Sequence, residues 1–315
     1  MNSPSDNSTW DQILSLFPES AQADIASIRD NGGCLKSDRV AKLMGSYAEI
    51  GTLMISLLPV AAKYAVVPVS NYHVGAVAAG MAPPGGWPSL YLGANFEYSG
   101  ISLPFTTHAE QSATNNAWLH GETGIQALAI SAAPCGYCRQ FLYELVTQPT
   151  LSILLPTGTG NQYTLNPLGY YLPNAFGPHD LGINGGLMDP KYCTHNLTLN
   201  DGSQDPLVLQ ALAAAQSCYA PYTTAFAGCA LQMTDNSVYT GRYAENAAYN
   251  PTLLPLESAF TFMNMNQPQT ATRQVARAVL VEVQTTINQF QATQTVLGSY
   301  APNVTLEYHT ASVVS

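Results

Sequence analysis

The strongest constraint in this chain of 315 residues is a pair of short motifs that bring rare, reactive side chains close together in the sequence. The first starts at His108 with the letters HAEQSATNNAWLHGE, and the second starts at Pro134 with PCGYCRQFLYEL. Each motif predicts the start of a helix, and an apolar segment lies between them. The chain has only six histidines and six cysteines, so we interpret this clustering as one site.

The segments around the motifs alternate between extended and helical patterns. Four apolar segments predict strands, namely residues 70–80, 90–98, 125–132 and 151–155. The turn-rich PPGGWP at 83–88 joins the first two into a hairpin, and helices are predicted over 47–64 and, after Ser20 as N-cap, up to the Asn-Gly-Gly stop at 31–33. The order helix, strand, strand, helix, strand, helix, strand predicts the α/β class, with a mixed sheet covered by helices.

That order predicts a geometry for the two motifs. Both helices follow the sheet, so their first turns can converge above the strand ends, where the positive end of a helix favours thiolates at Cys135 and Cys138. Two thiolates and the imidazole of His108 would leave the fourth position of a tetrahedral zinc open to water, as in catalytic zinc sites. Glu110, two residues after His108, would be free to accept a proton from that water.

Each motif taken alone also occurs in unrelated kinds of site. A lone C-x-x-C is found in thioredoxin-like redox pairs and as half of a structural zinc site, and a lone H-x-E is weaker still. The conjunction of H-x-E, a helix, a strand and P-C-x-x-C is far more specific, and it is the signature of zinc-dependent nucleobase deaminases. A purely structural zinc or redox protein would instead show a fourth protein ligand, or would have no need for Glu110.

Composition limits the partners. The chain is 46% hydrophobic and long enough for two domains of ~150 residues each, but ten Lys and Arg face twenty Asp and Glu, for a net charge of −10. No basic surface for a polynucleotide can be assembled, so we expect a small-molecule partner and no nucleic acid.

The N-terminus lacks the pattern of a signal peptide, and the apolar stretch 51–68 is interrupted by Pro59 and Lys63. We therefore expect a cytoplasmic protein that does not contact a membrane.

At this point the chain resembles a known family, the long, two-domain, homodimeric cytidine deaminases. The resemblance runs in family order between residues 64 and 260, and His108 in H-A-E matches the long type, since the short tetrameric type usually has three cysteine ligands. The matching segments are SNYHVGAVA, GANFEYSG, THAEQSA, AWLHGE, PCGYCRQF, YYLPNAFGPHDL and GRYAENAAYNPTLLPLESA. The resemblance implies a duplicated three-layer α/β/α fold with a mixed five-stranded sheet, a homodimer, and hydrolytic deamination of cytidine and deoxycytidine in pyrimidine salvage.

The resemblance also implies roles for individual residues. His108, Cys135 and Cys138 match the ligands of one zinc per chain, and Glu110 matches the carboxylate that moves protons. The open alternatives are a polynucleotide cytidine deaminase, which would need basic channels with interleaved aromatic residues, and a deaminase of another aminated nucleoside.

Three further residues match substrate-binding positions of the family. Asn95 and Glu97 match the pair that hydrogen-bonds the ribose, and residues at i and i+2 of a strand do point to one face. Taken alone, that pair would more often be a solvated strand edge. Tyr72 matches a position where the family places an aromatic ring, often Phe, beside the pyrimidine, although tyrosine alone is more often core packing.

An internal repeat explains the second half of the chain. PVSNYHVGAV at 68–77 aligns with PYTTAFAGCA at 221–230, and GANFE at 93–97 aligns with GRYAE at 241–245. In the second copy the position of His108 falls near 254–256, and no P-C-x-x-C follows it. The repeat predicts a second deaminase-like fold without metal, kept for packing against its partner domain and a second subunit. The expected division is a helical segment at 1–46, a zinc-binding catalytic domain at 47–185 and a metal-free domain at 186–315.

The remaining cysteines do not form a second motif. We interpret Cys34, Cys193, Cys218 and Cys229 as small buried apolar residues. The CTH cluster at 193–195 is interpreted as coincidence in a linker. Arg139 could hold a ligand thiolate or simply cap a surface, and it stays outside the predicted site.

Overall fold

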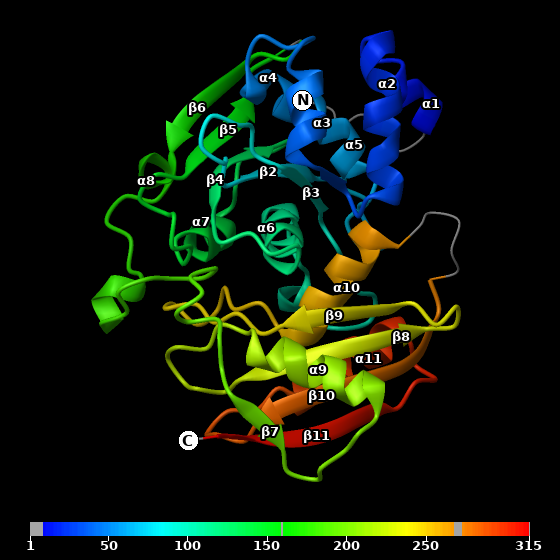
Figure 1. Cartoon of the computed structure of the whole chain (residues 1–315), viewed down its shortest axis with the longest axis vertical. Coiled ribbons are helices and arrows are strands. Elements are labelled where there is room, and N and C mark those ends of the chain that lie inside the picture. The colour runs from blue at the N-terminus through cyan, green and yellow to red at the C-terminus, as the bar shows by residue number, and fades with distance from the viewer. Residues whose placement is uncertain (1–8, 159, 268–272, 315) are drawn as a thin grey trace.

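Two sheets with helices on both faces make up the chain (Figure 1). The structure is a computed structural model that describes residues 9–158, 160–267 and 273–314. We call the part built on the first sheet the first half and the part built on the second sheet the second half. The duplicated three-layer α/β/α fold that the sequence predicts is confirmed.

The first sheet is mixed and has the order β1-β3-β2-β4-β5-β6. Its strands are β1 (Cys34–Leu35), β2 (Gly75–Gly80), β3 (Leu90–Ala94), β4 (Ile125–Ile130), β5 (Ser152–Pro156) and β6 (Tyr163–Pro167). Only β4 and β5 pair in parallel. The sheet has six strands where five were expected, because the two-residue β1 adds to its edge by pairing with β3.

The predicted strands are present, but the first hairpin is shorter than predicted. β2 starts at Gly75 and β3 ends at Ala94, so residues 70–74 and 95–98 lie outside the sheet. The reason is a set of side-chain hydrogen bonds that hold segment 69–74 in a turn, among them the bond from the Val74 N–H to Asn95 Oδ1, at 2.9 Å. This turn becomes part of the site described below.

Helices cover both faces of the first sheet. On one face lie α4 (Ile50–Ser56) and α5 (Leu58–Ala62), with the N-terminal helices α1 (Trp10–Leu14), α2 (Glu19–Ala26), η1 (Ser27–Asp30) and α3 (Ser37–Leu43) packed outside them. The predicted helix over 47–64 is divided in two, because Pro59 has no N–H to continue the ladder. The predicted stop is confirmed by positive φ angles at Gly32 and Gly33. The other face carries α6 (Ala109–Leu119) and α7 (Gly136–Leu142).

The second half repeats this plan with the strand order β7-β11-β10-β8-β9. Its strands are β7 (Leu197–Leu199), β8 (Ala227–Met233), β9 (Val238–Arg242), β10 (Val275–Val283) and β11 (Leu306–Val313). One face carries α9 (Pro206–Gln216), and the other carries α10 (Pro255–Asn266) and α11 (Phe290–Tyr300). The short turns η2 (Leu103–Phe105), α8 (Leu168–Tyr171) and η3 (Pro178–Leu181) lie in the connections.

Four glycines confirm the internal repeat in atomic detail. A Cβ on Gly75 would lie 2.4 Å from the carbonyl oxygen of Leu58 in α5, and a Cβ on Gly228 would lie 2.3 Å from an amide nitrogen in α9. Likewise, a Cβ on Gly93 would collide with the backbone of α6, and one on Gly241 would collide with α10. In each half, therefore, one glycine lets the preceding helix approach the sheet and a second glycine lets the following helix approach the opposite face.

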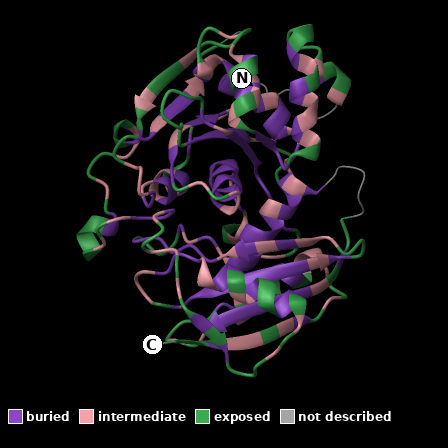
Figure 2. Cartoon of the chain, in the orientation of Figure 1, coloured by how far each residue is buried: buried purple, intermediate pink, exposed green. Residues whose placement is uncertain are grey.

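Helix α6 lies between the first sheet and α10 of the second half (Figure 1). Figure 2 shows that α6 and the central strands of both sheets are buried, and every residue of α6 from Ala109 to Trp118 is buried.

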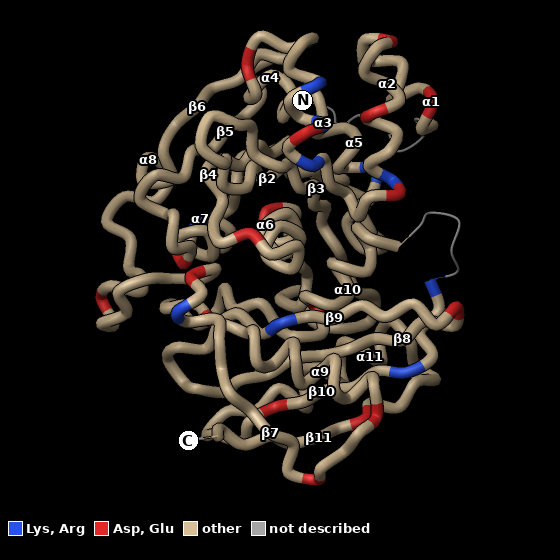
Figure 3. Tube along the Cα trace, viewed as in Figure 1, with Lys and Arg blue, Asp and Glu red and all other residues tan. Residues whose placement is uncertain are grey.

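Charged residues are sparse along the described part of the chain, and Lys and Arg occur singly in Figure 3, without a continuous basic stripe in that view. Among the described residues, no helix is long and apolar enough to cross a bilayer.

Candidate active site

Two helix N-termini carry the predicted ligands. His108 is the N-cap of α6 and Cys135 is the N-cap of α7, with Cys138 buried in the first turn of α7. The Nδ1 atom of His108 lies 3.3 Å from Sγ of Cys138 and 3.6 Å from Sγ of Cys135. The ligand atoms of the three residues lie within 4.8 Å of one another. The fold thus brings together side chains that are 30 residues apart in the sequence.

The protonation of this cluster fits a metal site. Hydrogen bonds from Cys138 and His108 lower the pKa of the Cys135 thiol to about 3. The pKa of Cys138 is raised well above its usual value, because Cys138 donates to Cys135 and is buried. A metal ion would release these protons, since cysteine binds metals as thiolate. One imidazole and two sulfurs are donors that suit zinc, and three protein ligands are the number found in catalytic zinc sites, so the residues fit this ion.

Glu110 lies on the first turn of α6, two residues after His108. Its side chain is only 4% exposed, and this burial raises the pKa of its carboxyl. The same residue lines the cavity in front of the metal-ligand cluster. A carboxyl whose pKa is raised holds a proton more readily than an exposed one, which suits a group that takes up a proton and passes it on in general acid–base catalysis.

The cluster opens into a cavity of about 300 Å³. This volume is at the lower end of the range for small-molecule sites. Its walls come from the turn before β2, the segment after β3, the start of α6 and the loop before α7, and they consist of Ser70, Tyr72, Val74, Asn95, Glu97, Thr106, His108, Ala109, Glu110, Ala132, Ala133 and Cys135. Six of the seven residues predicted for the site line this cavity, and Cys138 lies behind it as a neighbour of His108.

Asn95 lies just past the end of β3 rather than within it. Its Oδ1 accepts the Val74 N–H at 2.9 Å, and its Nδ2 donates to the Tyr72 carbonyl at 2.9 Å. Between Asn95 and Glu97, the buried Phe96 forms one isolated β-bridge to Val66 and another to Thr107. Phe96 therefore points into the core, and its two polar neighbours both face the cavity, as the i, i+2 spacing predicted.

Glu97 organises the turn before β2. Its Oε2 accepts the N–H groups of Val69 and Ser70 at 3.0 and 2.9 Å, and the Ser70 hydroxyl donates to its Oε1. Next to them, Asn71 has a positive φ of 52°. Sequence reasoning missed Ser70, which lines the cavity and also accepts the Tyr72 N–H at 3.0 Å. The signal was present, because Ser70 starts the matching segment SNYHVGAVA.

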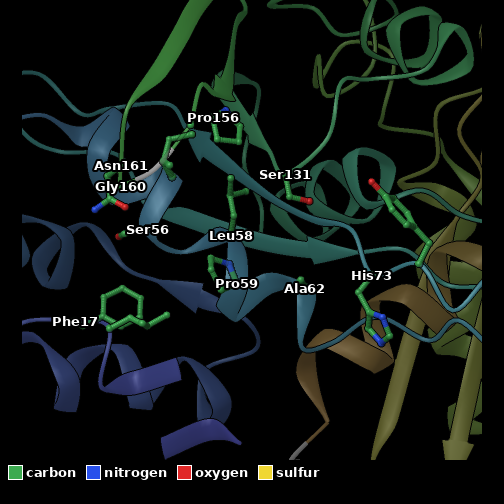
Figure 4. Close-up of a pocket in the computed structure, with 14 residues that line it drawn as sticks. Phe17, Ser56, Leu58, Pro59, Ala62, His73, Ser131, Pro156, Gly160 and Asn161 are labelled. Carbon is green, nitrogen blue, oxygen red and sulfur yellow. The ribbon is translucent and has the colours of Figure 1, made fainter. Parts of the chain in front are cut away.

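Tyr72 lies where this cavity meets a larger one. Its side chain is 51% exposed, which is unlike core packing and leaves the ring available for stacking. The neighbouring cavity of about 610 Å³ extends from Tyr72 to the N-terminal helices, and Figure 4 shows Phe17, Pro59 and Asn161 around it. Tyr72 therefore lies between the cavity at the metal-ligand cluster and a second, mostly apolar hollow.

Arg139 does not bond a ligand thiolate in any contact that the structure shows. Its Nε donates to the Pro134 carbonyl at 2.8 Å and its Nη1 donates to the Tyr171 carbonyl at 2.9 Å. Arg139 thus braces the loop that presents Cys135.

The other cysteines behave largely as expected. Cys34, Cys218 and Cys229 are buried, while Cys193 is only partly buried. His195 stacks on Phe226 with ring centroids 3.8 Å apart, and it bonds the Cys218 carbonyl. Throughout the described ranges, the only group of three or more potential ligands within metal-binding distance is that of His108, Cys135 and Cys138.

Comparisons with known proteins agree with this geometry. Two stretches, residues 51–151 and 168–294, match models of the cytidine and deoxycytidylate deaminase zinc-binding region. A cytidine deaminase of Aliivibrio fischeri is 46% identical over 257 residues, which are 81% of this chain and 81% of that relative. Cytidine deaminases of Photobacterium profundum (44%, with 81% of this chain and 82% of the relative) and Sodalis glossinidius (43%, with 85% and 86%) are also similar.

The match extends over both halves, and its first stretch contains all seven residues predicted for the site. Relatives this similar over four fifths of both chains establish common descent, and they agree with the duplicated fold and with the His-Cys-Cys cluster. The chain belongs to the cytidine deaminase family.

Proposed function

We propose that the protein is a zinc-dependent hydrolase that deaminates cytidine and 2′-deoxycytidine to the uridine nucleosides and ammonia, a reaction of pyrimidine salvage. The observation that carries the proposal is the convergence of a His-Cys-Cys cluster, a buried carboxyl and a pair of polar side chains on one cavity of about 300 Å³. The relatives reported above carry the name cytidine deaminase. The runner-up functions are a polynucleotide cytidine deaminase and a deaminase of another aminated nucleoside.

In the proposed site, His108, Cys135 and Cys138 hold one zinc per chain. When bound there, zinc supplies a Lewis acid that makes a water molecule acidic enough to attack at neutral pH. Glu110 takes the proton of the attacking water and passes it to ring N3 of the pyrimidine. Oxygen then adds at C4. Glu110 takes the second proton of that water from the added hydroxyl and gives it to the amine as the C4–N4 bond breaks, so that cytidine and water give uridine and ammonia.

Substrate contacts are proposed for three residues. Asn95 and Glu97 would bond ribose hydroxyls, and Tyr72 would stack against the pyrimidine. A carboxylate has about four acceptor positions, and the turn at 69–70 uses three of those on Glu97, which lines the cavity and keeps one position for a ligand. A free 3′-hydroxyl suits that position, whereas a 3′-phosphate would be repelled by the carboxylate.

The assay that tests the function uses purified protein with cytidine, followed by the ultraviolet change and by ammonia release. Cytosine base, nucleotides and oligonucleotides should be poor substrates or inert. A competition between cytidine and a cytosine-containing single strand separates the two leading functions. Comparable turnover of the strand would support the polynucleotide deaminase.

We also propose that the chain divides at 1–46, 47–185 and 186–315, and that it forms a homodimer in which the metal-free domain of one chain closes the active site of the other. The exposed ring of Tyr72 and the open neighbouring hollow support a cover from outside the chain. Residues 1–185 alone should then be poorly active. Sedimentation that shows a fully active monomer at assay concentration would contradict the dimer.

A cytoplasmic location is part of the same proposal. All six cysteines are free thiols, which suits a reducing compartment.

A further inference from the structure

A buried carboxylate joins the cysteine-bearing helix of the first half to the second half. Glu144, two residues past the end of α7, is 0% exposed. Its Oε1 accepts the hydroxyls of Tyr219, at 2.7 Å, and Tyr222, and its Oε2 accepts the Ala247 N–H at 2.8 Å. All three donors belong to the second half. Burial raises the pKa of Glu144, so these bonds offset a desolvation cost that the fold would otherwise not tolerate.

A second bond makes the same connection. The Nδ2 of Asn246 donates to the carbonyl of Gln140, inside α7, at 3.0 Å. The second half therefore holds α7 both within the helix and just beyond its end. At the other end of the helix, Arg139 braces the loop before Cys135.

Two of the three donors, Tyr219 and Tyr222, come from the segment before β8, which corresponds to the turn before β2 of the first half, whereas Ala247 follows β9. Glu245 accepts the N–H groups of Tyr222 and Thr223 and the Thr223 hydroxyl. Glu97 makes the same three kinds of bond to Val69 and Ser70. Tyr222 thus occupies in the second half the position that Val69 occupies beside the active site.

We propose that the metal-free copy uses this turn to position the zinc-ligand helix, with Glu144 as the positioning residue through which Tyr219, Tyr222 and Ala247 act. Helix α7 has only seven residues and is ~10 Å long, so a shift at its C-terminal end moves Cys138 and Cys135 relative to His108. The inference rests on the proposed zinc site, and it assigns the second half a task in that site within the same chain.

Two variants and a matched control test the inference. Glu144→Gln keeps the shape but turns one acceptor into a donor, and Tyr222→Phe removes a single hydroxyl and should fold even if the first variant does not. Asn264→Ala is the control, because Asn264 is equally buried and joins α10 to the Tyr64 carbonyl without touching α7. The measurements are zinc release to a chromogenic chelator, kcat and KM for cytidine, and the unfolding temperature.

Loss of a direct outer contact of a metal ligand typically costs ~10- to 100-fold in metal affinity. Glu144 acts on the ligands through α7, so we take the lower end of that range and expect both test variants to release zinc ~10-fold faster than the wild type. Their kcat should fall while KM for cytidine changes little, because the turn at 69–74 is intact. Asn264→Ala should unfold at a lower temperature and release zinc at the wild-type rate.

Wild-type zinc release from Glu144→Gln and Tyr222→Phe would overturn the inference, and so would equally fast release from Asn264→Ala. Wild-type protein that holds no zinc would overturn the proposed function and this inference together. The two failures are thus distinguishable.

Discussion

The two halves share a turn and differ in chemistry. In each half a glutamate, Glu97 or Glu245, holds the turn before the second strand by two backbone N–H groups and one hydroxyl. Each turn contains one residue with positive φ, Asn71 in the first half and Thr224 in the second. Because the second half keeps these bonds although its described residues form no metal-ligand cluster, the bonds belong to the fold and are no proof of substrate binding by themselves.

The halves diverge at the helix that follows. His108 caps α6, and Leu254 has the same place before α10. In both helices the side chain of the third residue accepts the backbone N–H of the N-cap residue. This residue is Gln111 in α6 and Glu257 in α10. A few substitutions at fixed positions thus separate a helix start that can hold a metal ion from one that only packs.

The largest effect is expected when a cysteine of the metal cluster is removed. Cys135→Ala should abolish both zinc binding and turnover, because two protein ligands cannot hold a catalytic zinc. Metal analysis and the cytidine assay measure this. Cys229→Ala, in the buried strand β8 of the second half, is the matched control and should keep both zinc and turnover. Full zinc occupancy in Cys135→Ala would remove this cluster as the metal site.

The second prediction separates the metal from the base. Glu110→Gln keeps size but cannot accept a proton, so zinc should stay while turnover falls by at least ~10²-fold, the lower end for general acid–base catalysis. Metal content and kcat are measured on the same sample. A near-normal rate would show that Glu110 is structural. The corresponding change in the second half involves Leu256, which has no carboxyl to lose.

The third prediction compares the same substitution at Glu97 and at Glu245, to separate a contact with the substrate from support of the turn. Glu97→Ala and Glu245→Ala remove the same three hydrogen bonds and should lower stability to a similar extent. Glu97→Ala should raise KM for nucleosides, by one charge-assisted hydrogen bond of ~1.5–3 kcal/mol, or about 10- to 150-fold, with zinc retained. Glu245→Ala should leave KM near the wild-type value, because its turn carries Tyr222 toward Glu144 and lines no part of the nucleoside cavity. An equal rise in KM in both variants would mean that the carboxylate of Glu97 acts only through the fold.

The sequence predicted the metal cluster and most strands because these depend on local patterns. The spacing of His108, Cys135 and Cys138 and the apolar runs of β2 to β5 need no knowledge of distant contacts. Residues 70–74 of this turn were predicted as strand, because the bonds that hold the turn to Asn95 and Glu97 come from more than 20 residues away.

The contact of Glu144 with Tyr219 and Tyr222 lay beyond sequence reasoning for the same reason. It spans 75 and 78 residues, and no pattern within α7 marks it. Local periodicity predicts elements, whereas polar contacts between halves depend on how the elements finally pack.

The smallest effect on turnover is expected at the third residue of the helix that each half places after its hairpin, which is Gln111 in α6 and Glu257 in α10. A change there should act on the pH dependence of stability. Glu257 is 5% exposed, and burial raises its pKa from 4.5 to about 8. The folded chain therefore binds a proton that the unfolded chain releases near pH 4.5. The contribution of Glu257 to the free energy of unfolding is therefore full below pH 4.5. It is lost as the pH rises to about 8, because the buried carboxylate is then charged in the folded chain. Glu257→Gln copies the neutral residue of the first half and should remove this loss. Urea unfolding at pH 5 and pH 8 should show that the wild type loses more stability than the variant, by an amount on the order of a few kcal/mol, with cytidine turnover unchanged. Glu19→Gln, on the exposed side of α2, is the control and should follow the wild type. Parallel pH profiles for the wild type and Glu257→Gln would mean that Glu257 is already charged in the folded protein at pH 5, and that the two helix starts differ only in side-chain chemistry and not in proton binding.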